Sequence, residues 1–420
     1  MKKASLLNFL LTIALVVIFL TPMLNRNLPR PLQISLFVLY FISLFFEKGA
    51  LKWLKCNAKI ILWIVIWQGL ELFYWIVGYS TALSGNYMMS LFSYGIIIVG
   101  LFSYSKFSYF QKISIIIFII GSIIYNIYDN IMINALYGGA TNDIYKDWGS
   151  DYLETNVAET GFYGAVMLFI GCLSIALFKS KKVLLNVFIS IVILLSLGFA
   201  FLITPRGIAC TFIVVEIAFI MLKTGFVTKQ KLFLFLVIAL AVFFVFKTAV
   251  IDVEDSHGGI GRLAERGTSV LDFINRGTLD DESSFGARIN LYLMSLETWL
   301  SSPITFLFGI GYHLGDYGFS LGLGQHSRYA DVLANYGVLG FTILLVLTYK
   351  LYRVLKKNAG EEWYLHKVVL TMYILYGVVD HNRNIQMIII IFFLLPLINT
   401  LYNQFTIANE KLRYTGIKHN

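Results

Sequence analysis

Long apolar stretches recur along the whole chain, separated by mostly short polar segments. A helix needs about 17–25 apolar residues to cross a bilayer. Twelve stretches meet or approach this length: 6–24, 32–46, 60–78, 87–104, 113–134, 157–178, 183–203, 207–222, 231–250, 335–352, 364–379 and 385–402. The pattern predicts an all-α polytopic membrane protein with about twelve transmembrane helices.

Two of the segments between these stretches are longer, 135–156 and 251–334. The second has 84 residues, too many for a passive connector. Its part SSFGARINLYLMSLETWLSS has one apolar stripe at helical spacing, formed by Ile289, Tyr292, Leu293, Leu296 and Leu300. An amphipathic helix lying along the membrane surface is predicted there. The glycine-rich stretch FGIGYHLGDYGFSLGLGQ that follows predicts a tightly turning loop.

Three regions follow from this pattern. Residues 1–250 are predicted to form a transmembrane bundle of about nine spans. Residues 251–334 form a large extracytoplasmic loop with the amphipathic helix, and residues 335–420 form the last three spans and a cytoplasmic tail.

Charge placement gives the predicted orientation. The chain is 58% hydrophobic and 14% charged, which is typical of membrane proteins. With the N-terminus inside, the cytoplasmic side carries 20 Lys and 2 Arg, and the outer side 2 Lys and 9 Arg. Lysines concentrated on one side indicate cytoplasmic N- and C-termini in the inner (cytoplasmic) membrane. The net charge of +9 is thus explained by topology, and no nucleic-acid partner is predicted.

The outer arginines need another explanation, because positive charge there opposes the topology. A guanidinium offers a planar fork that matches phosphate or carboxylate. The alternative is that they pair with acids of the same loops. These residues are Arg26, Arg30, Arg206, Arg262, Arg266, Arg276, Arg288, Arg328 and Arg383.

Two candidates stand at predicted span ends. His326 precedes the tenth span, where a neutral imidazole can take a proton from a sugar hydroxyl; an interfacial hydrogen bond is the alternative. Arg206 lies in the short turn TPRG between two spans. It either meets an anion or is an arginine that reaches the interface.

Other candidates have structural alternatives. Arg288 opens the amphipathic helix and can pair with an acid just upstream. Arg328 is expected to pair with Asp331 at i+3. Glu159, at the outer end of the sixth span, is a further candidate, as are His381 and Arg383 in the turn DHNRN.

Two carboxyls and three cysteines lie elsewhere. Glu71 and Glu216 fall within apolar stretches, and each is expected to hydrogen-bond a neighbouring helix. Cys56, Cys172 and Cys210 show no disulfide or metal spacing, so no metal site is predicted.

The chain resembles the Wzy-type polymerases of O-antigen and capsular polysaccharide, which share a superfamily with the O-antigen ligases. Three stretches carry the resemblance: TPRG at 204–207, SSFGARINLYLMSLETWLSSPITFLFGIGYH at 283–313, and QHSRYADVLANYGVLGF at 325–341. The first has proline where serine is usual. The likeness covers mainly residues 200–345, while the first half matches only in topology.

The resemblance implies a metal-independent, GT-C-like glycosyltransferase without a cofactor, acting on the outer face. Its donor and acceptor would be glycans on undecaprenyl pyrophosphate, and its partners a chain-length regulator and a flippase. Arg206 and Arg288 would bind the pyrophosphate, and His326 would be the base for the acceptor hydroxyl. The remaining outer candidates, Arg262, Arg266, Arg328, Glu159, His381 and Arg383, would bind substrate.

Three other functions stay open, one of which is a purely structural or regulatory membrane protein. An O-antigen ligase shares the fold and the chemistry but transfers to a different acceptor. A flippase or secondary transporter of the same lipid-linked glycan also suits twelve spans, although transporters usually place polar residues at mid-bilayer.

Overall fold

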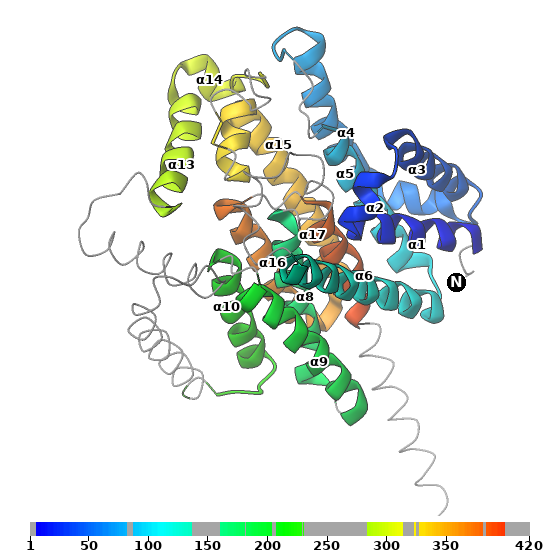
Figure 1. Ribbon diagram of the computed structural model, residues 1–420. Helices are drawn as coiled ribbons and strands as arrows, with labels where there is room; N and C mark the ends of the chain where they lie inside the picture. The colour runs from blue at the N-terminus through cyan, green and yellow to red at the C-terminus, as the bar shows by residue number, and fades with distance from the viewer. Residues whose placement is uncertain are drawn as a thin grey trace, which may run out of the picture.

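A computed structural model describes residues 6–81, 87–136, 160–180, 182–203, 207–228, 230, 284–313, 323–324, 327–380 and 384–399. Within these ranges every regular element is a helix (Figure 1). The helices are α1 (Leu6–Leu20), α2 (Pro22–Asn27), α3 (Arg30–Phe45), α4 (Ala50–Ile76), α5 (Tyr87–Lys106), α6 (Tyr109–Leu136), α8 (Thr160–Lys179), α9 (Val183–Gly198), α10 (Gly207–Lys223), α13 (Ser284–Leu300), α14 (Pro303–Phe308), α15 (Arg328–Ala359), α16 (Trp363–Val379) and α17 (Ile385–Ile389). Three short elements continue them: the π-helices η1 (Phe199–Ile203) and η3 (Ile390–Leu394) and the 3₁₀ turn η2 (Gly360–Glu362).

Eleven of the twelve predicted apolar stretches coincide with helices, and the stretch 231–250 lies outside the described residues. Five helical stretches are long and apolar enough to cross a membrane: Ala50–Ile76, Tyr109–Ile131, Phe162–Lys179, Val183–Phe201 and Arg328–Val379, the last containing both α15 and α16. Shorter apolar helices cover Leu6–Leu20, Arg30–Phe45, Ser90–Lys106 and Ile385–Asn399. The described chain is therefore an α-helical membrane protein.

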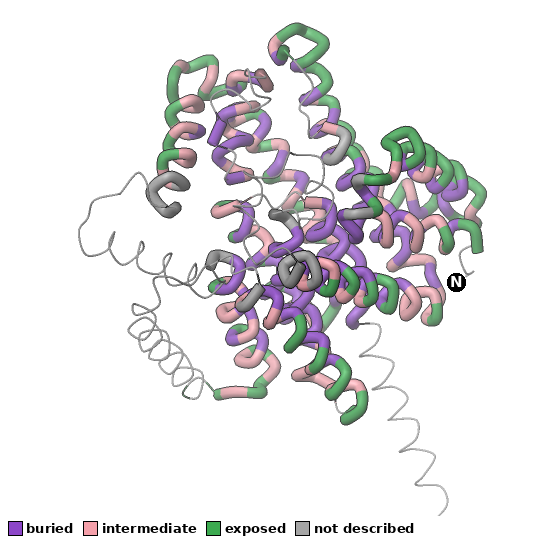
Figure 2. The backbone as a smooth tube through the Cα atoms, viewed as in Figure 1, coloured by how far each residue is buried: buried purple, intermediate pink, exposed green. Residues whose placement is uncertain are grey.

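The helix α8 lies at the centre of the bundle. In its apolar window 78% of the residues are buried, compared with 33% in the window that includes α9. Helices α9, α10, α16 and α17 pack around α8, and buried residues concentrate there (Figure 2). Large apolar side chains such as Leu184 and Leu194 on α9 are exposed, as expected of a surface that faces lipid.

Some boundaries differ from the predictions. The helix α4 begins ten residues before the predicted span, so Lys52, Lys55 and Lys59 lie on its first turns instead of in a loop. Likewise α15 begins at Arg328, and the predicted boundary at 334/335 falls inside it. Hydropathy marks only the apolar part of a helix, whereas backbone hydrogen bonding continues into its polar ends.

Two contacts between helix ends each join segments that the sequence predicts on the same side of the membrane. Lys179, at the end of α8, forms an ion pair with Glu362, and both lie in predicted cytoplasmic loops. At the opposite end, Thr81 N–H donates to the Tyr312 carbonyl over 3.0 Å, and both lie in predicted outer segments. Segments assigned to the same side are thus found together.

Candidate functional site

The helix α13 is fastened to the start of α15 by one serine. Ser295 Oγ donates to Asp331 Oδ1 over 2.8 Å and accepts from Gly324 N–H over 2.9 Å. Ser295 is 1% exposed and Asp331 7%, so water hardly competes for these bonds. The Ser295 clasp, meaning Ser295, Asp331 and Gly324, joins three separate stretches of chain.

A break in α15 provides a second attachment. Gly337 has φ 60° and ψ −163°, which interrupts the helical ladder. The carbonyls of Ala334 and Asn335, which a regular helix would pair with residues four further on, instead accept from Ile310 N–H (2.8 Å) and Gly311 N–H (2.9 Å). The chain that follows α14 is thereby bonded directly into α15.

Side chains at the end of α4 hold the same chain from the other side. Tyr74 Oη donates to the Phe308 carbonyl (2.8 Å), and Tyr79 Oη donates to the Gly309 carbonyl (2.6 Å). Burial raises the pKa of Tyr79, so its hydroxyl remains a donor at neutral pH. Residues 308–312 are therefore fixed between α4 and α15.

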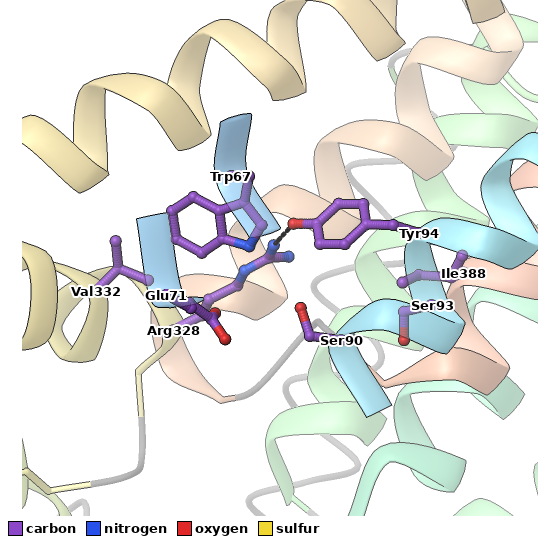
Figure 3. Close-up of a pocket in the computed structure, with 8 residues that line it drawn as sticks. All are labelled: Trp67, Glu71, Ser90, Ser93, Tyr94, Arg328, Val332 and Ile388. Atoms are coloured by element: carbon purple, nitrogen blue, oxygen red, sulfur yellow. Dashed lines mark hydrogen bonds between the residues drawn. The ribbon is translucent and has the colours of Figure 1, made fainter. Parts of the chain in front are cut away.

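A small hollow lies beside the first turn of α15 (Figure 3). Arg328 extends past the Trp67 ring, and its Nη2 donates to Tyr94 Oη over 3.3 Å. The lining residues come from four helices: Trp67 and Glu71 from α4, Ser90, Ser93 and Tyr94 from α5, Arg328 and Val332 from α15, and Ile388 from α17. Most of this lining is polar or aromatic, although it lies among apolar helices.

The hollow is small. Its central space is about 20 Å³, enough for about one ordered water. A guanidinium, a carboxyl and hydroxyls line that space, so it suits a water or a hydroxyl group, which can both donate and accept. Because Arg328 is the first residue of α15, the hollow lies at the predicted outer end of the bundle.

Most predicted site residues lie outside the described ranges. These are Arg206, His326, Arg262, Arg266, Glu159, His381 and Arg383. Arg288 lies in the described backbone of α13, and Arg328 is the one predicted site residue whose side chain the described ranges include. The helix α15, which contains the predicted tenth span, begins at Arg328, with Ser327 Oγ accepting from Ala330 N–H as its cap.

Partners on other helices are found for one predicted pair, and one predicted hydrogen bond is missing from the described residues. Arg328 and Asp331, which the sequence predicts to pair, each have a partner on another helix, Tyr94 and Ser295 respectively. Glu216 was expected to hydrogen-bond a neighbouring helix. Both of its carboxyl oxygens are buried and accept no hydrogen bond from the described residues, and the side chain lies against Gly171 of α8.

The partners supplied by α5 were not predicted from the sequence. Ser90, Ser93 and Tyr94 stand at i, i+3 and i+4, so they share one face of that helix. Polar residues at this spacing in an otherwise apolar stretch were the signal available. It did not show which other helix this face would meet.

Metal ligands do not gather in the described ranges, where no group of three His, Cys, Asp or Glu side chains comes together. The chain matches no protein-family model and no curated protein.

Proposed function

We propose that the protein is a polysaccharide polymerase, which joins oligosaccharide repeat units carried on undecaprenyl pyrophosphate at the outer face of the inner membrane. The proposal includes the GT-C-like arrangement of about twelve spans with cytoplasmic termini. A chain-length regulator and a flippase of the same pathway are the proposed partners.

One observation supports this function above the others. The described parts of the second and third stretches that carry the resemblance, 283–313 and 325–341, pack against each other. Ser295 contacts Asp331, and Ile310 and Gly311 bond Ala334 and Asn335. A reaction that needs groups from both stretches requires them to be adjacent.

The proposed chemistry needs few groups. An acceptor sugar hydroxyl bonds to the anomeric carbon of the donor, and the bond from that carbon to the diphosphate oxygen breaks. His326 takes the hydroxyl proton, and the polyprenyl diphosphate leaves with the bonding electron pair. Arg206 and Arg288 stabilise the charge that develops on the diphosphate. Arg328, with Arg262, Arg266, Glu159, His381 and Arg383, is assigned to substrate binding.

The test is polymer length in a strain that lacks the protein. We expect the wild-type chain to restore long polymer, while His326→Ala, present in the membrane at normal level, leaves single repeat units. Arg288→Lys should fail as well, because an ammonium keeps the charge but loses the fork. Long chains made by His326→Ala would refute the role of this residue as base. Full-length polymer left unattached in the deletion strain would indicate a ligase.

A further inference from the structure

We propose that Ser295 is a positioning residue for this reaction: it locks α13 against the start of α15, so that the two stretches that carry Arg288 and His326 keep a fixed relation. The inference rests on the proposed function and deepens it.

The hydroxyl of Ser295 both donates and accepts a hydrogen bond. A serine hydroxyl has one proton to donate and lone pairs to accept with. Here the proton goes to Asp331 Oδ1 and a lone pair accepts from Gly324 N–H. A single buried group therefore ties α13 to α15 and to the segment before α15.

Helical register extends this lock to position 288. Arg288 precedes Ser295 by seven residues, close to two turns, so the two positions share a face of α13. Ser295 contacts residues 324 and 331, which places that face toward the stretch 323–331. Fixing the rotation of α13 at Ser295 thus also fixes the direction in which position 288 is presented.

The residues that precede and follow positions 325 and 326 are also held in place. Gly324 N–H is held by Ser295, and Ser327 caps the first turn of α15. Two residues, Gln325 and His326, separate these anchored positions.

The fit around Gly324 is close, which keeps the clasp in register. A Cβ at this position would lie 1.8 Å from the Leu291 carbonyl oxygen. The helix α13 also packs along α15 and α14, and the Tyr292 hydroxyl contacts the Val378 carbonyl, so we expect α13 to stay docked when the clasp is removed. Loss of Ser295 Oγ should therefore loosen the orientation of α13 without detaching it.

The experiment uses the full-length chain in lipid vesicles with lipid-linked repeat units taken from the deletion strain. Ser295→Ala should lower kcat about tenfold and leave KM within about twofold, since the hydroxyl orients groups and does not bind substrate. Hydrogen exchange of residues 323–331 should become about tenfold faster. Ser301→Ala is the matched control, because it removes an exposed hydroxyl outside the clasp.

A second pair of variants keeps the test valid if Ser295→Ala does not fold. Asp331→Asn keeps an oxygen that can accept from Ser295 and should retain most of kcat, whereas Asp331→Ala should behave like Ser295→Ala. Unchanged exchange in Ser295→Ala would overturn the lock. Faster exchange with unchanged kcat would overturn the positioning role alone. A wild-type chain that forms no polymer from these units would refute the proposed function and with it the role in the reaction, while the exchange data would still decide whether the clasp exists.

Discussion

At the scale of single residues, two polar pairs join neighbouring helices of the bundle. Arg328 meets Tyr94, and Ser295 meets Asp331, in both cases across two helices. A polar group that lacks a hydrogen bond among apolar helices lowers the stability by several kcal/mol. Such pairs therefore help to specify which helices become neighbours.

The Arg328–Tyr94 bond gives a prediction at this scale. Tyr94→Phe removes the hydroxyl acceptor but keeps the ring, and should lower the free energy of unfolding by about 1–3 kcal/mol. The midpoint of thermal unfolding in detergent is the measurement. Tyr125→Phe, on the exposed side of α6, is the matched control and should change little. An equal midpoint for Tyr94→Phe and wild type would mean that this bond contributes no net stability.

At the scale of elements, the most informative feature is the break in α15. The left-handed backbone at Gly337 releases two carbonyls, and the chain after α14 supplies their donors. A continuous helix would leave Ile310 and Gly311 without these acceptors. The kink in α15 and the docking of 308–312 are therefore one structural feature.

Gly337→Ala should disturb both the kink in α15 and the docking of residues 308–312. The positive φ costs a residue with a Cβ about 1–3 kcal/mol. The new Cβ would also lie 2.4 Å from the Leu307 backbone, which has to move. We expect a lower unfolding midpoint and faster proteolysis between α13 and α15. Gly121→Ala on α6 is the control. An added Cβ there would meet no atom of another part of the protein within 4 Å, so this variant should be neutral or slightly stabilising. If both variants behave alike, the kink does not hold the segment.

At the scale of the whole molecule, two sets of helix ends are distinguished. Lys179 and Glu362 meet at one end, and Thr81 and Tyr312 meet at the other. The excess of lysine at the first end assigns it to the cytoplasm in our proposal. An exposed native cysteine, Cys56, lies on the first turns of α4 at that end, whereas Cys172 and Cys210 are buried.

Labelling of cysteines tests this orientation. A membrane-impermeant maleimide should leave Cys56 unmodified in intact spheroplasts and modify it in inside-out vesicles, as read from the mass of the protein. Ser301→Cys, an exposed position at the predicted outer end, should show the opposite behaviour. Modification of Cys56 from outside the cell would reverse the proposed topology.

The lengths of the apolar stretches were enough to predict eleven of the described helical segments, because a bilayer requires long apolar helices with satisfied backbones whatever their neighbours are. The helix α13, which ends at Leu300, was predictable from the helical spacing of its apolar residues. The meeting of Ser295 with Asp331, the insertion of 310–311 into α15, and the pairing of Arg328 with α5 were decided only by the tertiary structure. Each joins residues at least 24 positions apart, from Ile310 to Ala334 at the nearest, and periodicity along one segment says nothing about which face of another it will contact.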